Sequence, residues 1–225
     1  MTTKNSKPRI YSRVISTVSN DIYLSGAIEE PENYIEELQT LREAHEGDEI
    51  RIYINSCGGY VATAIQIVNG IRNCKAKVIA VLEGECHSAA TYIFLACDEW
   101  EVNLGVLMLI HNYSGGAYGK GADLVDNVKA NDRWVKNIMG TIYEGFLTES
   151  EINQVNLNRD IWLETDEIME RLGNLVELRD TKLEAHNKVL RLEALERVRE
   201  MTQDDTEDID GVQESSTEQQ DIPGS

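Results

Sequence analysis

The sequence lacks any run of apolar residues that approaches the roughly 20 needed for a membrane-spanning helix. Its first residues, MTTKNSKPRIYSRV, also lack the apolar core of a secretory signal. Over 225 residues, 41% are hydrophobic and 27% are charged, a composition typical of a soluble globular protein with one sizeable core. We therefore expect a cytoplasmic protein that does not act in a membrane.

Basic residues are scarce. The chain has 21 lysines and arginines against 40 aspartates and glutamates, which gives a net charge of −19 at pH 7. This balance argues against nucleic acid or an anionic membrane surface as the main partner. Residues 202–225 contain eight acidic side chains and no lysine or arginine, so we expect a disordered, solvated tail there.

Cysteine and histidine are also rare, with four residues of each. The cysteines form no C-x-x-C pair, which argues against a zinc site. We expect no bound metal and four reduced, mostly buried thiols, at Cys57, Cys74, Cys86 and Cys97.

Strand and helix patterns alternate along the first part of the chain. Strands are expected at 21–26, 49–55 and 77–84, with helices at 31–47 and 60–73 between them. A strand, helix, strand order favours parallel pairing with right-handed crossovers, which predicts an α/β fold.

The second half continues this alternation and then becomes helical. We expect a buried helix at 88–97, strands at 100–102 and 106–111, and a glycine-rich loop at 112–122. Two further helices are expected, from Asp123 to about Phe146 and after the capping box Thr148-Glu149-Ser150-Glu151. This unit ends near Leu175-Val176, and residues 177–201 predict an additional amphipathic helix.

A serine lies where an apolar strand gives way to an apolar helix, in VLEGECHSAATYIF at 81–94. As a nucleophile, Ser88 would need a base, a group that orients the base, and donors for the developing oxyanion. The amides of the first helical turn, beginning with Ala89, lie near it. The glycine pair Gly58-Gly59 offers a second donor and an edge for an extended peptide, although a simple turn would also account for it.

Two histidines are candidates for the base. His87 adjoins Ser88, but neighbouring residues at a helix start point about 100° apart, which is a poor geometry for proton transfer. His111 ends the strand VLMLIH just before the glycine-rich loop, a position where α/β folds assemble sites. A purely structural role for His111 stays open.

Asp160 is the candidate for orienting the base. In NRDIWLE it precedes Trp162 and Leu163, so it could be partly buried and hydrogen-bonded to an imidazole. An ion pair between Asp160 and Arg159 is the alternative.

Four segments, in this order, resemble the proteolytic subunit of the Clp protease, ClpP: RIYINSCGGYVATA, GECHSAA, LMLIHNYSGGAYGKGAD and LNRDIWLE. The resemblance runs from about Ile10 to Val176. It implies that Ser88 is the nucleophile, His111 the general base and Asp160 the orienting group. It also implies an oxyanion hole and a peptide-binding surface, the former from the amides of Gly59 and Ala89 and the latter from Gly58, Gly59, Tyr60, Gly115 and Gly116.

The resemblance further implies a fold and an assembly. The fold is ClpP/crotonase-like, with repeated β-β-α units and a projecting handle helix that begins at Asp123. Two rings of seven stack into a closed chamber, and an ATP-driven unfoldase of the AAA+ class feeds it with unfolded proteins or peptides; the hydrolysis itself needs no cofactor. The expected organisation is a flexible N-terminus, a serine peptidase domain, the C-terminal helix and the acidic tail, at 1–9, 10–176, 177–201 and 202–225.

The chain departs from the family pattern at several positions. The family's Ser-Pro-Gly-Gly is SCGG at 56–59, and its Ser-Met-Gly is SAA at 88–90, so we expect altered specificity. Arg51 and Asn73 stand where aromatic residues line the unfoldase docking cleft, which predicts altered docking. A virus-encoded or accessory member that trims assembly proteins would fit these departures.

Two alternatives to an active peptidase stay open. The first is a non-catalytic ring subunit with a structural or binding role. The second is a crotonase-fold enzyme that acts on an acyl-coenzyme A and stabilises an enolate with paired amides. The intact set of Ser88, His111 and Asp160 argues against both.

Overall fold

The computed structural model describes residues 16–116 and 118–213, with side chains through Glu196. The chain forms two compact units, Met1–Gly173 and Asn174–Ser225. The expected flexible N-terminus at residues 1–9 lies outside the described residues.

Strands and helices alternate through most of the first unit. The strands are β1 (Ser19–Ile28), β2 (Glu49–Gly59), β3 (Lys77–His87), β4 (Glu99–Val102), β5 (Leu107–Ile110) and β6 (Ile161–Glu164). The helices are the 3-10 turn η1 (Pro31–Tyr34), α1 (Ile35–Glu43), α2 (Val61–Arg72), α3 (Ala89–Ala96), α4 (Gly121–Ile142), α5 (Glu149–Asn156) and α6 (Thr165–Gln213). The predicted α/β class is confirmed.

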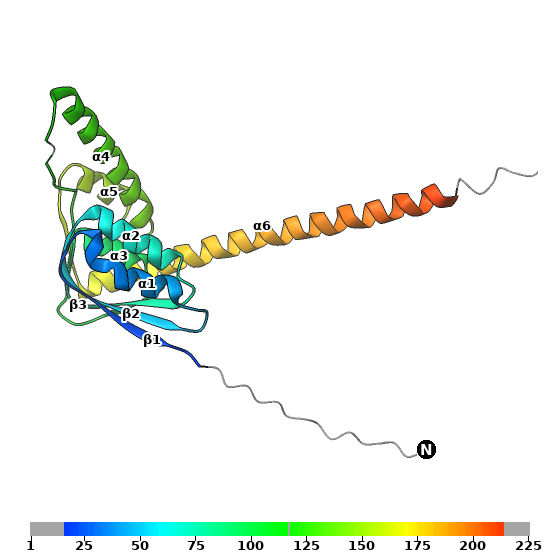
Figure 1. The fold of residues 1–225 in the computed structure, drawn as a ribbon, viewed down its shortest axis with the longest axis horizontal. Helices are drawn as coiled ribbons and strands as arrows, with labels where there is room; N and C mark the ends of the chain where they lie inside the picture. The colour runs from blue at the N-terminus through cyan, green and yellow to red at the C-terminus, as the bar shows by residue number, and fades with distance from the viewer. Residues whose placement is uncertain (1–15, 117, 214–225) are drawn as a thin grey trace, which may run out of the picture. The chain divides into compact units, whose positions relative to one another are not determined.

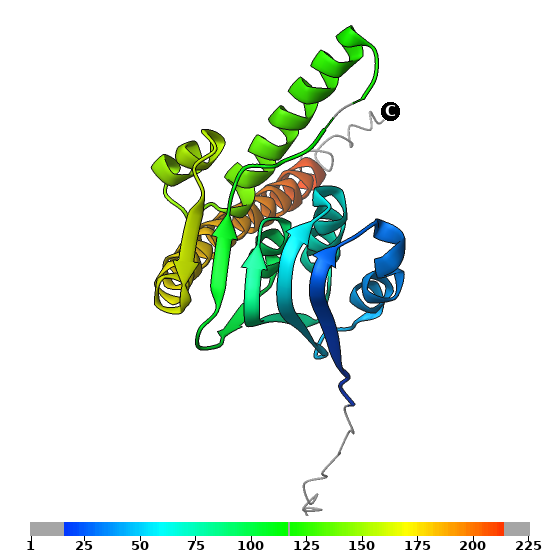
Figure 2. The ribbon, with the colours of Figure 1, turned by 90° about the vertical axis from the view of Figure 1, so that its left-hand side faces the viewer.

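The six strands form one sheet in the order β1-β2-β3-β5-β6, and β4 also pairs with β3. All of these pairs are parallel except β5 with β6, which is antiparallel. Figure 2 shows the strands side by side, from β1 in blue to β6 in yellow-green. The predicted parallel pairing of the first three strands is therefore confirmed.

The core lies between this sheet and the helices α1, α2 and α3, which cover one of its faces (Figure 1). Strand β3 buries the consecutive residues 78–82, as expected for a central strand of the sheet. In α3 seven of the eight residues are buried. These two elements meet at Ser88, so the segment that carries the candidate nucleophile is anchored in the most buried part of the fold.

Strands β2 and β3 extend further than the sequence pattern predicted. β2 was expected to end at residue 55 and β3 at residue 84, but they continue to Gly59 and His87. Their register shifts after Ile54, and the side chain of Asn55 accepts a hydrogen bond from the Glu85 amide (3.0 Å) at this irregularity. The glycine pair Gly58-Gly59 therefore ends a strand instead of forming a separate turn.

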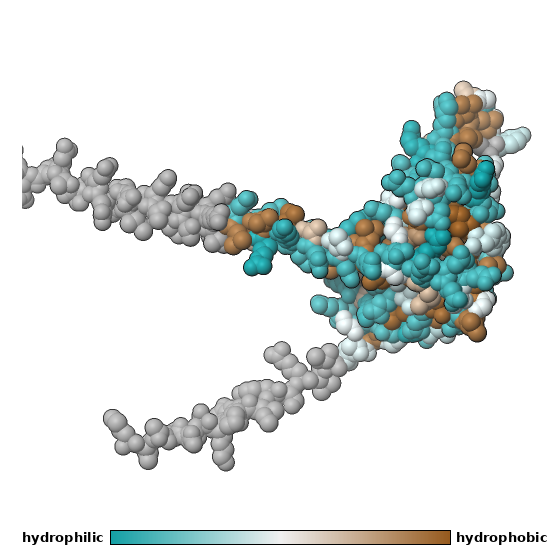
Figure 3. Space-filling view, turned by 180° about the vertical axis from the view of Figure 1, so that it is seen from behind, coloured by the Kyte–Doolittle hydropathy of each residue, from teal (hydrophilic) through white to brown (hydrophobic). Residues whose placement is uncertain are grey.

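Helix α4 projects from the body of the first unit, as predicted for the handle (Figure 1). It begins two residues before the predicted start and ends four residues before the predicted end. Apolar side chains are exposed along it, with Val125, Val128 and Trp134 each at least 41% accessible. Figure 3 shows apolar surface gathered over this helix.

The predicted capping box at the start of α5 is confirmed. The Glu151 amide donates to Thr148 Oγ1 (3.2 Å), and the Thr148 amide donates to the Glu151 carboxylate (2.8 Å). Arg171 of α6 binds the same carboxylate through two nitrogens, at 2.7 and 3.1 Å. The Arg171 guanidinium, assisted by Thr148, lowers the pKa of the Glu151 carboxyl from 4.5 to about 2.

Replacing Glu151 with glutamine should destabilise the fold by about 1–2 kcal/mol at pH 7, because a charge-assisted pair becomes neutral. The folded-state pKa lies below the unfolded one, so the stabilisation is complete above about pH 5 and is lost as the pH falls toward 2. Urea unfolding of both proteins between pH 7 and 3 would measure this difference. A gap between wild type and Glu151→Gln that stays constant down to pH 3 would contradict the assignment.

Helix α6 is 49 residues long and crosses two predicted boundaries. The domain end near Leu175-Val176 and the tail start at residue 202 both fall inside it. The segment is rich in leucine, glutamate and arginine and contains no proline, so nothing in its composition stops the helix. Residues 202–213 are thus helical, contrary to the expected disorder, and 214–225 lie outside the described residues. No helix in the described part of the chain is both long and apolar enough for a membrane span.

All four cysteines are free thiols. Cys86 and Cys97 are buried, whereas Cys57 is exposed and Cys74 is half-buried. The expectation of mostly buried thiols is thus right for two of the four, because Cys57 lies near the exposed end of β2. No group of three or more His, Cys, Asp or Glu side chains among the described residues is placed to hold a metal ion.

Candidate active site

Ser88 occupies a strained turn between a strand and a helix. It follows β3 and precedes α3, and its backbone has φ 54° and ψ −125°. Non-glycine residues rarely adopt a positive φ, and such strain costs about 1–3 kcal/mol. A serine at a helix N-cap usually accepts a hydrogen bond from the helix, but Ser88 makes no such side-chain bond. The turn resembles the nucleophile elbow of α/β-hydrolases, where strain presents a serine hydroxyl above a sheet.

Strand pairing brings the other two candidates to the same edge of the sheet. The Ser88 amide donates to the Leu109 carbonyl (2.8 Å), so Ser88 lies beside the end of β5. His111 is the first residue after β5, and Asp160 is the last before β6. Because Ile110 pairs with Ile161 in an antiparallel ladder, the next opposed residues are His111 and Asp160. The backbones of Ser88, His111 and Asp160, which are remote in sequence, therefore lie at the same edge of the sheet.

Strand register brings the backbones of the three residues to one edge of the sheet, but their side chains are not hydrogen-bonded to one another. No hydrogen bond among the described residues joins Ser88, His111 or Asp160. Ser88 and His111 are half-buried, whereas Asp160 is exposed. The expectation of a partly buried Asp160 is wrong. This residue lies just before β6, and Trp162 within that strand is also exposed. The alternative ion pair with Arg159 is likewise absent from this described part of the chain.

The glycine pair at the end of β2 packs directly against the serine turn. A β-carbon on Gly58 would lie 2.7 Å from Ser88 Cβ and 2.5 Å from the His87 carbonyl oxygen, closer than atoms can approach. Gly58 has φ +83°, and its amide donates to the buried Ser56 hydroxyl (3.2 Å). Only glycine fits here, so the backbone of β2 lies next to the candidate nucleophile.

Backbone amides are available around this position. Ala89 is the first residue of α3, and an amide there has no acceptor within its own helix. The N-terminus of a helix also carries partial positive charge. The Ala89 amide lies close to Gly58, and an amide of this kind suits an oxyanion; the assignment of that role to Gly59 and Ala89 stays a prediction.

A buried polar chain behind Ser88 was missed in the sequence analysis. Thr91 Oγ1 donates to the Ser88 carbonyl (2.6 Å) and shares a second hydrogen bond (2.6 Å) with the Tyr143 hydroxyl. Thr91 is fully buried, and burial raises the pKa of Tyr143 well above its usual range. The chain therefore ties the serine turn to the end of α4. A threonine in an otherwise apolar helix was the signal for it.

The contacts of His87 do not include Ser88. Its Nδ1 lies 3.8 Å from the Glu85 carboxylate, and its ring meets the edge of Trp162 at a centroid distance of 5.6 Å. Its Nε2 is buried without a hydrogen-bond partner. These contacts suit a packing role for His87 better than proton transfer.

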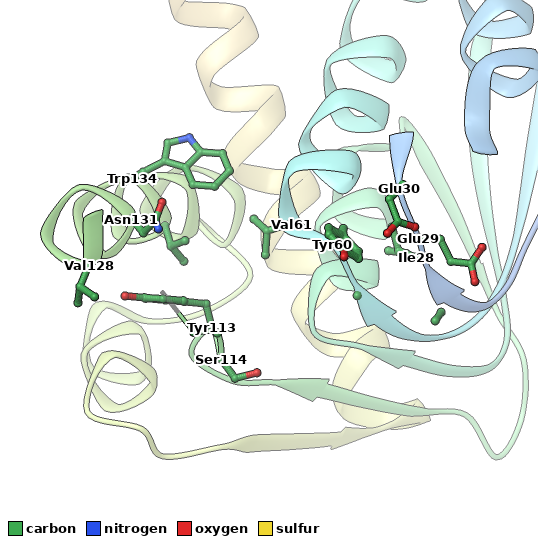
Figure 4. A pocket seen from close by; sticks show the side chains of 15 residues that line it. Ile28, Glu29, Glu30, Tyr60, Val61, Tyr113, Ser114, Val128, Asn131 and Trp134 are labelled. Atoms are coloured by element: carbon green, nitrogen blue, oxygen red, sulfur yellow. The ribbon is translucent and has the colours of Figure 1, made fainter. Parts of the chain in front are cut away.

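A cleft of about 720 Å³ includes Gly59, whose chain neighbour Gly58 packs against Ser88; Ser88 itself does not line the cleft. It is bounded by the ends of β1 and β2, the start of α2, the loop after β5 and one side of α4 (Figure 4). Four of the five residues predicted to bind peptide line it, namely Gly59, Tyr60, Gly115 and Gly116, whereas Gly58 does not. The lining from α4, including Val128 and Trp134, was not anticipated, because sequence alone does not show which face of a projecting helix is turned toward the sheet.

A family model described as Clp protease matches residues 3–173, three quarters of the chain. The chain belongs to the Clp protease family. The match ends where the first compact unit ends, so the Clp protease region contains the whole candidate site, and most of α6 lies beyond it.

Curated relatives in the Clp protease family share about a quarter of their residues with this chain. It is 26% identical over 153 residues to the ATP-dependent Clp protease proteolytic subunit 2 of Pseudomonas aeruginosa, covering 66% of this chain and 76% of that protein. It is 29% identical over 160 residues to subunit 3 of Rhizobium johnstonii, covering 66% and 78%. It is 25% identical over 166 residues to subunit 1 of Borreliella burgdorferi, covering 71% and 84%.

Proposed function

We propose that the chain is a serine endopeptidase that cleaves unfolded proteins or peptides. The main support is the strained turn at Ser88, whose hydroxyl caps no helix, together with the strand register that sets His111 opposite Asp160. Membership of the Clp protease family and the names of the relatives point to the same activity.

In the proposed reaction the Ser88 hydroxyl attacks the peptide carbonyl carbon while His111 accepts the hydroxyl proton. The amides of Gly59 and Ala89 hold the oxyanion of the tetrahedral intermediate. As the carbon–nitrogen bond breaks, His111 returns the proton to the departing amine. Water then attacks the acyl ester with the same base and releases Ser88. Asp160 keeps the imidazole oriented and stabilises its charged form.

We also propose assembly into stacked rings of seven subunits, since the relatives are named as subunits of a protease. Val125, an exposed apolar side chain of α4 that does not line the cleft, suits a contact between copies. The name "ATP-dependent" supports an unfoldase partner, but the docking position differs from the family pattern. Arg51 there forms ion pairs with Glu49 and Glu101, and Asn73 bonds the Asn69 carbonyl (2.7 Å).

A fluorophosphonate probe and native mass spectrometry on one sample would test this proposal. We expect one label per chain, mapped to Ser88 by peptide sequencing, in an assembly of fourteen chains of 25.3 kDa each. The missing hydrogen bonds between the three side chains favour the alternative of a non-catalytic ring subunit. Assembled rings that bind no probe and cleave no peptide would establish that alternative.

A further inference from the structure

The cleft that includes Gly59 and Tyr60 combines aromatic walls with negative charge. The rings of Tyr60, Tyr113 and Trp134 line it, as do the residues Glu29 and Glu30. None of its 15 lining residues is a lysine, arginine or histidine. Figure 4 shows Glu30 beside Tyr60, with Trp134 across the cleft on α4. A cleft with this lining should favour positively charged groups over negatively charged ones.

The two glutamates point in different directions: Glu30 lies beside Tyr60, whereas the Glu29 side chain points away from Tyr60 and Trp134 (Figure 4). The negative charge of Glu30 raises the pKa of the neighbouring Tyr60 hydroxyl. The Glu29 carboxylate accepts a hydrogen bond from Asn33 Nδ2 (2.9 Å), and its carbonyl accepts one from Thr63 (2.8 Å). Within residues 16–116 and 118–196, neither glutamate forms an ion pair.

We infer that this cleft binds a lysine or arginine side chain of the peptide substrate, an inference that rests on the proposed function. The aliphatic stem of such a side chain lies along the apolar wall and the aromatic rings, and the charged head reaches Glu30. A cation near an aromatic face gains about 0.5–2 kcal/mol, depending on its desolvation. The net charge of −19 adds a general attraction for cationic chains.

The size of the cleft fits a stretch of peptide as well as one side chain. A volume of about 720 Å³ lies within the usual range for binding sites and exceeds what one lysine fills. Gly59 lines the cleft, and the preceding residue, Gly58, packs against Ser88. In this proposal the peptide runs from the cleft past these two glycines to Ser88, so that the basic residue is only a few positions from the cleaved bond.

Peptides that differ at one position would test the inference. In a fluorogenic peptide, each position near the cleaved bond would carry lysine, arginine, norleucine or glutamate. At one position we expect kcat/KM to be roughly 10-fold higher for the basic residues than for norleucine, and lowest for glutamate. In Glu30→Gln this ratio should fall to about threefold or less, since the charge at the rim is lost. Glu32→Gln, an exposed acid outside the cleft, is the matched control and should keep the full ratio.

Salt provides a second measurement on the wild-type protein. Raising the ionic strength from about 0.05 to 0.5 M shortens the screening length, so the preference for basic peptides should shrink. Equal cleavage of basic and norleucine peptides at every position would overturn the inference. A preference that survives both high salt and Glu30→Gln would do so as well.

Binding to Ser88→Ala separates this inference from the proposed function. Fluorescence polarisation of the same peptides measures their affinity for that variant, which binds a peptide without cleaving it. Tighter binding of basic peptides, with no probe labelling of the wild type, would support the cleft and refute the peptidase. Probe labelling at Ser88 with no preference in binding or cleavage would refute the cleft alone.

Discussion

Replacing His111 with alanine should lower the rate of peptide cleavage roughly 10⁴-fold or more, nearly as much as replacing Ser88. The hydroxyl is a weak nucleophile unless a base removes its proton, and a base without its nucleophile has nothing to activate. The two losses should therefore not add, and the double variant Ser88→Ala/His111→Ala should be no slower than either single variant. Cleavage of a fluorogenic peptide at saturating concentration, by assembled protein, measures all three.

His87→Ala is the matched control, because it removes the other histidine next to Ser88. The substitution removes the packing of the His87 ring against Trp162 and a buried ring nitrogen that makes no hydrogen bond. We therefore expect kcat to fall by less than about 10-fold. Near-normal cleavage by His111→Ala, or a larger loss in His87→Ala than in His111→Ala, would refute His111 as the base.

Local rules in the sequence were sufficient for much of the fold. Strand and helix periodicity predicted the parallel strands β1, β2 and β3, because burial alternates along β2 and forms a continuous run in β3. The capping box at Thr148 predicted the start of α5, since both of its hydrogen bonds are made within four residues. The register brings the backbones of Ser88, His111 and Asp160 to one edge of the sheet. Their roles as nucleophile, base and orienting group came from the family resemblance and stay a prediction.

Features that depend on distant contacts were not predictable in this way. The antiparallel pairing of β6 with β5 joins segments about 50 residues apart, and the register that it sets leaves Asp160 exposed. The bond between Thr91 and Tyr143 spans 52 residues and gives no local pattern. The length of α6 was underestimated for a different reason, because its acidic C-terminal part has the composition of a disordered segment and yet continues a helix.

Replacing Gly59 with alanine should destabilise the fold and remove activity together. A β-carbon there would lie 2.1 Å from the Ile28 carbonyl oxygen, and φ is +152°, so the backbones of β1 and β2 must separate. We expect a loss of about 3 kcal/mol or more in stability, since neither strand can yield without breaking its ladder. In the fraction that folds, cleavage should fall roughly 10²-fold or more because the Gly59 amide, one of the two proposed oxyanion donors, is displaced. Thermal unfolding and cleavage per probe-labelled serine measure the two effects separately.

Gly140→Ala provides the matched comparison for this change. Gly140 lies in the interior of α4, where a β-carbon meets nothing within 4 Å, so alanine should stabilise the helix by up to about 1 kcal/mol. Cleavage should be unchanged, because Gly140 is not part of the cleft or of the serine turn. If alanine lowers stability and cleavage at Gly59 but not at Gly140, the losses come from the contact between β1 and β2 and not from the added methyl group itself. If Gly59→Ala kept full activity per labelled serine, the oxyanion would have to be held by amides other than that of Gly59.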